Sequence, residues 1–391
     1  MKALQLTMMC LLVIAFCFLP SFYQTQAATG KVKLIRTPNN GLQPQAAVDE
    51  RGTLHLIYLA GEPSASDIFY VRRDAGRNEF SAPLRVNSQP GSAIATGTIR
   101  GAQIALGKKG RIHVAWNGSS KFAPEGTHDV PMFYARMNDA GTGFEPQRNL
   151  MQFSRALDGG GSVAADKSGN VYVVWHGAGE QKGEQHRRIW LARSINEGKT
   201  FAREIAVDPA DASGKTTGVC ACCGLRAFVN SQGKLFVLYR TATDLTERGT
   251  FLLTSADKGK TFSGARMDHW NLTTCPMSST TMIEAKQTIG AWENNGQVFF
   301  GALDSTATVA TIAAPGSTGK RKHPAIAVNS LGETILVWTE GTGWKRGGSL
   351  AWQVFDREGK PTNKKGAAPD VPVWGLATVV AETGNSFSII Y

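Results

Sequence analysis

The residues best suited to chemistry are four cysteines in the second half of the chain. Three of them lie within four positions in "TGVCACCGLRAF" (217–228), and the fourth stands beside Met277 in "TTCPMSS" (273–279). Thiolates and thioethers are soft ligands that select Cu(I), whereas the same thiols form disulfides in an oxidising compartment. The cluster therefore indicates structural disulfides, a copper or redox centre, or free thiols. The four residues are Cys220, Cys222, Cys223 and Cys275.

The N-terminus decides which compartment these thiols meet. Residues 1–27 have the features of an export signal, because Lys2 precedes an apolar run over 4–19 and small residues lead up to Ala27. The apolar run is too short and too close to the terminus to favour a membrane span. We therefore expect an exported, periplasmic or secreted protein consisting of residues 28–391. An even number of cysteines in such a protein favours disulfides first.

The charge of the chain indicates its partners only broadly. The formal net charge is +11, but the positive residues are scattered and no nucleic-acid motif is present. We therefore expect no nucleic-acid partner and a mildly basic surface, one that could attract an acidic glycan or another small anionic ligand.

A repeat along the chain predicts the elements that position these groups. Five copies have a turn ending in Gly, then alternating apolar residues, then an aromatic residue six places after the Gly; examples are "GKKGRIHVAW" (107–116) and "DKSGNVYVVW" (166–175). Two weaker copies are "EAKQTIGAW" (284–292), which lacks the Gly, and "AETGNSFSIIY" (381–391), which is one residue longer. Such alternation is typical of a half-buried strand, and glycine readily adopts the positive φ of a tight turn. The aromatic residues are Tyr58, Trp116, Trp175, Tyr239, Trp292, Trp338 and Tyr391.

The repeat length predicts a β-propeller. Each gap between hairpins holds a third apolar run and usually a fourth, so every repeat supplies four short antiparallel strands, and no long amphipathic helix is visible. The last hairpin ends the chain after its second strand, and "KVKLIRT" (31–37) could complete that blade as an outer strand. We expect an all-β, single-domain propeller of seven blades closed in this way, with a six-bladed sialidase-type ring as the alternative.

Two turns between third and fourth strands carry a further motif. "SADKGKTF" (255–262) has the form Ser-x-Asp-x-Gly-x-Thr-Phe, and "SINEGKTF" (194–201) differs by Asn for Asp. The motif resembles the Asp-box, or BNR repeat, of the sialidase superfamily. Its polar side chain bonds backbone amides of its own turn. The motif residues are Ser194, Asn196, Gly198, Phe201, Ser255, Asp257, Gly259 and Phe262.

The resemblance implies a glycan-directed protein, either an exo-sialidase-like glycoside hydrolase or a lectin-like relative. In this superfamily the Asp-boxes lie on the face opposite the ligand site. Sialidases proper use three arginines, an acid/base Asp, and a Tyr activated by a Glu. This chain lacks the Arg-Ile-Pro segment of the first arginine, since Arg36 stands in "LIRTP", and it has no Tyr where the nucleophile is expected.

Propeller geometry brings the starts of first strands and the ends of second strands to one face. Arginines there could grip a carboxylate or sulfate, and two carboxyl groups could act as acid and base; alternatively, these charges pair with one another between blades. The catalytic candidates are Asp158, Glu293 and Glu340. The ligand-binding candidates are Arg100, Arg226, Arg240, His176 and His323.

The same geometry brings the cysteines together. The two cysteine segments occupy equivalent positions of consecutive repeats, so we expect a disulfide from Cys275 to the 220–223 cluster across a blade boundary. The competing interpretation is a copper or redox site with Met277 nearby. Three functions stay open: anionic-glycan binding or hydrolysis, a copper or redox propeller, and a non-enzymatic interaction scaffold.

Overall fold

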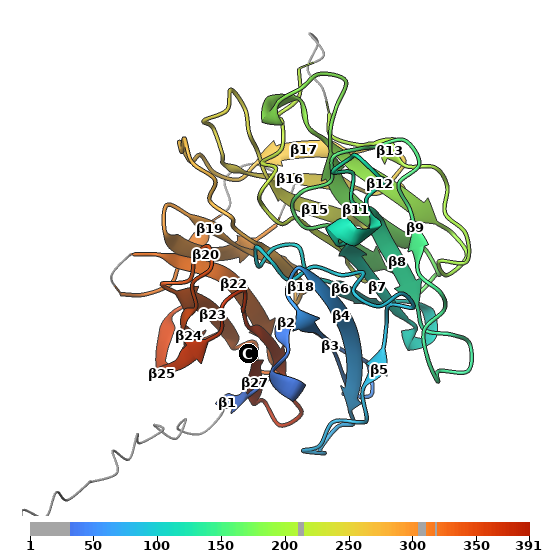
Figure 1. Cartoon of the computed structure of the whole chain (residues 1–391). Coiled ribbons are helices and arrows are strands. Elements are labelled where there is room, and N and C mark those ends of the chain that lie inside the picture. The colour runs from blue at the N-terminus through green and yellow to red at the C-terminus, as the bar shows by residue number, and fades with distance from the viewer. Residues whose placement is uncertain (1–31, 210–214, 304–309, 317–318) are drawn as a thin grey trace, which may run out of the picture.

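The computed structural model describes residues 32–209, 215–303, 310–316 and 319–391, and these residues form a ring of seven β-sheets (Figure 1). Six sheets contain four antiparallel strands each, in sequence order from the hub outward. The innermost strand of each sheet contacts the innermost strand of the next, and β2 (Leu42–Val48) contacts β26 (Thr378–Ala381) to close the ring. The predicted seven-bladed all-β propeller is confirmed, and the six-bladed alternative is wrong.

The strands of the first three blades, with the short 3-10 turns between them, are as follows. Blade 1 consists of β2, β3 (Leu54–Glu62), β4 (Ala65–Arg73) and β5 (Leu84–Arg85), preceded by η1 (Pro38–Asn40). Blade 2 consists of β6 (Gln103–Leu106), β7 (Ile112–Asn117), β8 (Met132–Arg136) and β9 (Arg148–Asn149), with η2 (Lys108–Gly110) and η3 (Ser120–Phe122). Blade 3 consists of β10 (Ser162–Ala165), β11 (Val171–Gly177), β12 (Arg188–Ser194) and β13 (Ile205–Ala206), with η4 (Glu184–His186).

The next three blades have the same plan. Blade 4 consists of β14 (Arg226–Val229), β15 (Leu235–Arg240), β16 (Thr250–Ser255) and β17 (Ser263–Arg266). Blade 5 consists of β18 (Thr281–Glu284), β19 (Thr288–Asn294), β20 (Gln297–Ala302) and β21 (Thr311–Ala313). Blade 6 consists of β22 (Arg321–Val328), β23 (Thr334–Glu340), β24 (Gly348–Phe355) and β25 (Pro361–Val371).

The closing blade joins the two ends of the chain. It contains β26, β27 (Phe387–Ile390) and β1 (Val32–Ile35), and β1 pairs with β27 in parallel (Figure 1). The N-terminal strand therefore completes this blade as predicted, but the blade has three strands and is not fully antiparallel. The direction follows from the chain path, because β1 must end on the face where β2 begins, and η1 alone bridges the two strands.

The core lies between neighbouring blades. One cluster joins Tyr172 and Leu191 of blade 3 to Leu235 and Leu253 of blade 4, and equivalent clusters fill the other boundaries. All seven repeat aromatics are buried, and Trp116, Trp175 and Trp292 are among the most completely enclosed side chains. The turn glycines take the positive φ that the repeat predicted, at Gly52, Gly110, Gly169, Gly233 and Gly332. This packing makes a rigid scaffold for the loops.

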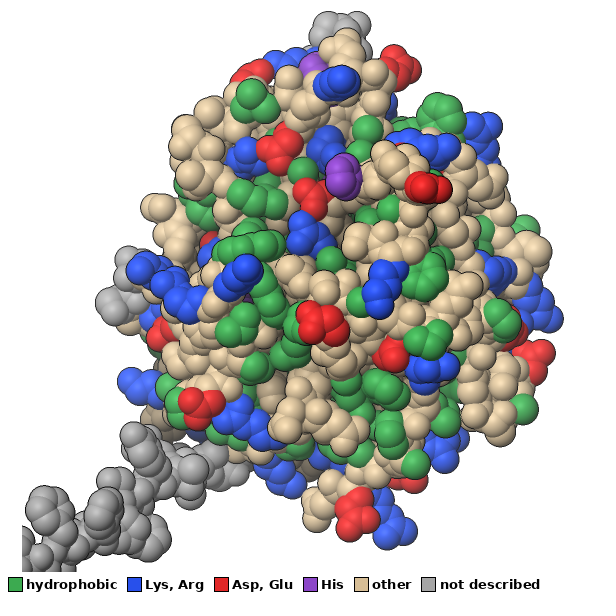
Figure 2. All heavy atoms as spheres, viewed as in Figure 1, with side chains coloured by type: hydrophobic (Ala, Val, Ile, Leu, Met, Phe, Trp, Pro, Cys, Tyr) green, Lys and Arg blue, Asp and Glu red, His purple; other side chains and the backbone are tan. Residues whose placement is uncertain are grey.

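The proposed export signal lies outside the described residues. Within the described parts of the chain, no helix has the length and apolar character needed to cross a bilayer. On the face seen in Figure 2, Lys and Arg side chains are interspersed with Asp and Glu and do not gather into one basic patch.

Candidate functional site

The propeller separates the candidate residues from the Asp-boxes. In blade 4, Arg226 pairs with Leu238 and Arg240 with Thr250 near one end of the strands, whereas Ser255 pairs with Leu235 at the other end. The cysteine-bearing loop enters β14 at the first end, and the Asp-box turn leaves β16 at the second. We call the first end the loop face and the second the Asp-box face.

The two Asp-boxes have the hydrogen bonds that their sequences predict. The carboxylate of Asp257 accepts from the backbone N–H groups of Lys260 and Thr261 at 3.0 and 2.9 Å, and the Ser255 hydroxyl accepts from the Gly259 N–H at 2.9 Å. In the other box, Asn196 Oδ1 accepts from the Thr200 N–H at 3.0 Å. Gly198 and Gly259 have φ values of 74° and 75°. Phe201 and Phe262 pack against the cores of their blades.

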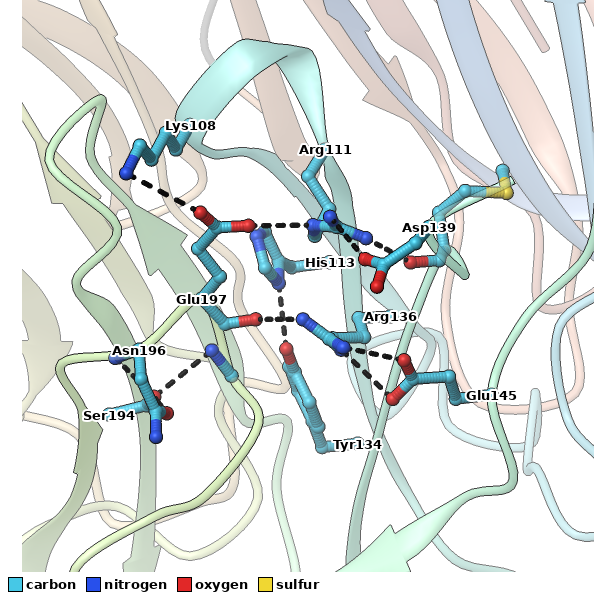
Figure 3. A network of polar contacts seen from close by, with 12 residues as sticks. Lys108, Arg111, His113, Tyr134, Arg136, Asp139, Glu145, Ser194, Asn196 and Glu197 are labelled. Atoms are coloured by element: carbon cyan, nitrogen blue, oxygen red, sulfur yellow. Dashed lines mark hydrogen bonds and ion pairs between the residues drawn. The ribbon is translucent and has the colours of Figure 1, made fainter. Parts of the chain in front are cut away.

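An ion-pair network between blades 2 and 3 surrounds the first Asp-box (Figure 3). Glu197 lies within the box turn, and its carboxylate meets Arg111 at 3.1 Å and Lys108 at 3.6 Å. Its carbonyl accepts from Arg136, which also pairs with Glu145 at 2.6 Å. These charges are mutually satisfied, so this network offers no unpaired charge to a ligand.

A small cavity lies at the hub, toward the loop face. It is lined by the first strands, or the residues just before them, of six blades, including Gln45, Ile99, Arg226, Thr280 and His323. Its volume is about 40 Å³, which accommodates a few water molecules but no sugar ring. A complete glycan residue would therefore have to lie above it, on the rim.

Arg226 is the charged group of this cavity. Its side chain donates to the Thr280 carbonyl at 3.3 Å and to Gln45 Oε1 at 3.2 Å. Among the ion pairs of the described residues, none involves Arg226, and burial lowers the pKa of its guanidinium to about 10. His323 lines the same cavity, and its Nδ1 lies within hydrogen-bond distance of the Ser279 hydroxyl, at 3.1 Å. Burial lowers the pKa of His323 to about 3. Arg226 is thus a half-buried cation in a cavity that a neutral imidazole also lines.

The rim of the cavity carries an ion pair and an exposed indole. Arg100 donates to the carboxylate of Asp158 at 2.5 Å and to its carbonyl at 2.8 Å. Trp344, in the turn between β23 and β24, is 54 % exposed and packs edge-on against Trp374. Gly97 links the two groups, because a Cβ there would meet both Arg100 and Trp344. The sequence offered one sign of Trp344, a tryptophan in the glycine-rich turn "EGTGWKRGG".

The other candidate carboxylates are held by cations. Glu340 accepts from Arg321 at 3.2 Å and from the Trp338 indole at 2.8 Å. Glu293 is buried, 3.7 Å from Lys322, and its burial raises the pKa to about 7 against the opposing charges of Lys322 and Arg240. With Asp158 bound to Arg100, each of the three proposed acid/base groups has a cationic partner.

Two candidate ligand-binding residues are buried away from the cavity. Arg240 donates to Ser278 Oγ at 2.6 Å and to the carbonyls of Arg248 and Glu293 at 2.6 and 2.5 Å. The guanidinium also lies over the Trp270 ring. His176 accepts from Arg187 at 2.9 Å through Nδ1, and burial holds its pKa well below the usual value. Arg240 already uses its donors within the protein, whereas His176 keeps a buried Nε2 without a hydrogen-bond partner.

All four cysteines meet at one place on the loop face. Cys222 and Cys275 form a disulfide between the loops that lead into blades 4 and 5, as predicted. Cys220 and Cys223 are free and buried, with their Sγ atoms 3.1 Å apart, and the Sγ of Cys220 lies 3.5 Å from that of Cys222. Met277 is half-buried in the loop that carries Cys275.

The two free thiols differ in character. The hydrogen bond to Cys223 and burial raise the pKa of Cys220. Burial opposes ionisation of Cys223, but the hydrogen bond from Cys220 and the charge of Arg240 outweigh it and lower the pKa of Cys223. Negative charge therefore favours Cys223, with the Cys220 thiol as its donor.

Comparisons with known proteins agree with the fold. No family model matches the sequence. No curated protein matches it either. A protein of unknown function from Dyadobacter fermentans has a TM-score of 0.53 with 13 % identity, over 88 % of this chain and 98 % of that one. A leech intramolecular trans-sialidase complexed with 2,7-anhydro-Neu5Ac has a TM-score of 0.51 with 8 % identity, over 85 % and 78 %. The sialidase-like propeller fold predicted from the Asp-boxes is thereby confirmed.

Proposed function

We propose that the loop face of this exported propeller binds an anionic glycan, with the acidic group of the ligand placed at the hub cavity. The observation that carries the proposal is Arg226, a half-buried guanidinium at the hub cavity that has no carboxylate partner among the described residues. Removing a charge from water is costly unless a partner compensates for it. A carboxylate or sulfate group from outside would supply that partner through paired N–H donors.

The dimensions of the cavity support the same arrangement. It holds only a small group, so the sugar ring of the ligand would rest on the rim, where Trp344 offers an apolar ring surface. The Arg100–Asp158 pair lies close by and provides donors and acceptors for hydroxyl groups. A site for an acidic group at Arg226 and a ring surface at Trp344 together favour a glycan over a free inorganic anion.

Binding is favoured over hydrolysis. A glycosidase needs one carboxyl group to act as an acid and another to act as a base or nucleophile. Here Asp158, Glu293 and Glu340 each contact a cation within 3.7 Å. We therefore infer a lectin-like role, while the release of sugar from a labelled glycan would identify the same face as that of a hydrolase.

Export is part of the proposal. The Cys222–Cys275 disulfide is of the kind that persists in oxidising compartments, which agrees with the signal-like segment 1–27. Cell fractionation with mass spectrometry of the mature N-terminus tests it: cleavage after Ala27 is expected, and an intact Met1 in the cytoplasm would contradict it.

The experiment for binding compares charged and neutral glycans. Purified protein is titrated with sialylated, sulfated and uronic-acid glycans and with neutral glycans of matched length. We expect binding of an acidic class, loss of that binding in Arg226→Gln, and no change in Arg77→Gln, which removes an exposed charge on the Asp-box face. Thermal unfolding shows whether each variant is folded. Binding that survives Arg226→Gln in a folded protein, or no binding to any class, would overturn the proposal.

A further inference from the structure

The sulfur cluster is not used by the glycan site. The Sγ atoms of Cys220, Cys222 and Cys223 all lie within 4.8 Å of one another. A structural role explains Cys222, which is bonded to Cys275, but it does not explain two free thiols at the same position. An exported protein that needed only a disulfide here would have no use for a second pair of thiols beside it.

We propose that this cluster is a Cu(I) site, with Cys220 and Cys223 as its principal ligands and Cys222 as a third when the Cys222–Cys275 disulfide is open. Thiolate sulfur is the ligand type that selects Cu(I). Two thiolates three positions apart on a loop anchored to a rigid blade can hold one ion without rearrangement of the propeller.

The charges around the cluster favour a monovalent ion. Arg240 acts on Cys223, and Arg187 and Arg248 both lie within electrostatic reach of Cys220. A Cu(I) ion bound by two thiolates has a net charge of −1, which these arginines stabilise. A divalent ion on the same two ligands would be neutral and would gain nothing from the three guanidinium groups.

Zinc would need ligands beyond the two free thiols. Structural zinc is held by four ligands in a tetrahedron. Around this cluster, His176 already uses Nδ1 to accept from Arg187, and Glu184 is bound to Arg248 at 2.6 Å. Glu293, the other nearby carboxyl group, lies 3.7 Å from Lys322. Nε2 of His176 and Oε2 of Glu293 have no hydrogen-bond partner, so discrimination against zinc rests on the charge of the site and is tested by competition.

The arginines also act as positioning residues. Nε of Arg240 donates to Ser278 Oγ at 2.6 Å, and Ser278 Oγ lies 3.5 Å from Cys223 Sγ, so the guanidinium is linked to the sulfur through one hydroxyl. Arg248 is buried, and its Nη1 has no hydrogen-bond partner. That donor is available to an anionic centre on Cys220.

The ion has a route to the site. Cys220 and Cys223 are buried, Cys222 is half-buried and Cys275 is exposed, so the disulfide covers the thiols at the surface of the loop face. Reduction of that bond by an external dithiol, which is itself oxidised to a disulfide, would expose the cluster and free Cys222 as a third thiolate. The affinity for Cu(I) should therefore increase when Cys222 is released.

The test uses the full-length mature protein under anaerobic conditions with ascorbate, and a Cu(I)-selective chelator as competitor. We expect one Cu(I) per chain, lost in Cys220→Ser and in Cys223→Ser. Cys275→Ser, which frees Cys222, should bind more tightly than the wild type, and Arg248→Gln about 10–100-fold more weakly. Ag(I) should compete for the site, and Zn(II) should not.

A merely structural cluster gives different results. It predicts no retained copper in any variant, Cys275→Ser included. X-ray absorption of the loaded protein should show sulfur as the only ligand type. Copper retained by a folded Cys220→Ser/Cys223→Ser double variant, zinc binding equal to copper binding, or no retention by the wild type would overturn the proposal. Glycan binding, measured in parallel, distinguishes this failure from failure of the hub site.

Discussion

Lys322 Nζ lies 3.7 Å from Oε1 of Glu293, and this pair joins blade 6 to blade 5 beneath the loop that carries the disulfide. Lys322 also donates to the carbonyl of Pro276 in that loop. Glu293 is nearly inaccessible to solvent, and its Oε2 has no hydrogen-bond partner. Lys322 therefore offsets the burial of the Glu293 carboxylate only in part. The carboxyl group keeps its proton to an unusually high pH.

The first prediction concerns pH and stability. The pKa of Glu293 is raised from 4.5 to about 7 in the folded protein, so between these values the folded state holds a proton that the unfolded chain releases. The contribution of Glu293 to the free energy of unfolding should therefore be complete below about pH 4.5. It should fall by up to about 3 kcal/mol as the pH rises from 4.5 through 7. Glu293→Gln should flatten that decline in urea unfolding curves, while Glu340→Gln should leave it; parallel profiles for the wild type and Glu293→Gln would disprove the assignment.

The second prediction concerns Arg240. Arg240→Met would leave two buried carbonyls and a hydroxyl without their donor, so the free energy of unfolding should fall by about 2–4 kcal/mol. Arg77→Met, at an exposed turn, should change it by less than about 0.5 kcal/mol. Chemical denaturation measures both variants. An Arg240→Met protein as stable as the wild type would argue against this structural role.

The third prediction concerns the disulfide. Cys222 and Cys275 are 53 residues apart, and closing a loop of that length restrains the unfolded chain. Cys275→Ala should lower the free energy of unfolding by roughly 2–4 kcal/mol. Reductant should destabilise the wild type to the same degree and leave the variant unaffected. If reductant has equal effects on both proteins, the bond is not the source of the stability.

The fourth prediction concerns the Asp-box. Hydrogen bonds from Thr261 and Ser255 hold the pKa of Asp257 well below its usual range, so its contribution to stability is present at neutral pH and is lost only in strong acid. Asp257→Ala should lower the melting temperature at pH 7. Asp257→Asn should be milder, because Asn196 makes the equivalent bonds in the other box. Glycan binding should be unchanged in both, and a loss of binding without unfolding would place a ligand on the wrong face.

Much of the fold was predictable because the repeated turn and strand patterns of the sequence correspond to the blades. Gly110 and Gly169 mark the hairpin turns, and Trp116 and Trp175 mark the buried ends of second strands. The meeting of Cys222 and Cys275 also follows from position within the repeat. The parallel pairing of β1 was not predicted, since it depends on the chain path from β1 to β2 and not on any pattern of residue types.

The site was less predictable because the irregular loops, and not the repeat, set its contacts. Sequence position placed Arg226 and Arg240 on the same face, yet one faces the hub cavity and the other is enclosed beneath Trp270. Lys322, the cation that holds Glu293, comes from β22 of the next blade, so no local spacing reveals it, whereas Arg321 lies opposite Glu340 within the same hairpin of blade 6. Trp344 was missed because it belongs to no repeat position.

The fifth prediction tests the central claim most directly, through a double-mutant cycle between Arg226 and the acidic group of the ligand. Affinities are measured by calorimetry for wild type and Arg226→Gln, each with an acidic glycan and with its carboxamide or desulfated analogue. A charge-assisted hydrogen bond at the hub predicts a coupling of at least about tenfold in affinity, with Trp344→Ala weakening both ligands equally. If the two changes are independent, so that Arg226→Gln weakens acidic and neutral ligands to the same extent, Arg226 does not bind the acidic group and the proposed mode of glycan recognition is wrong.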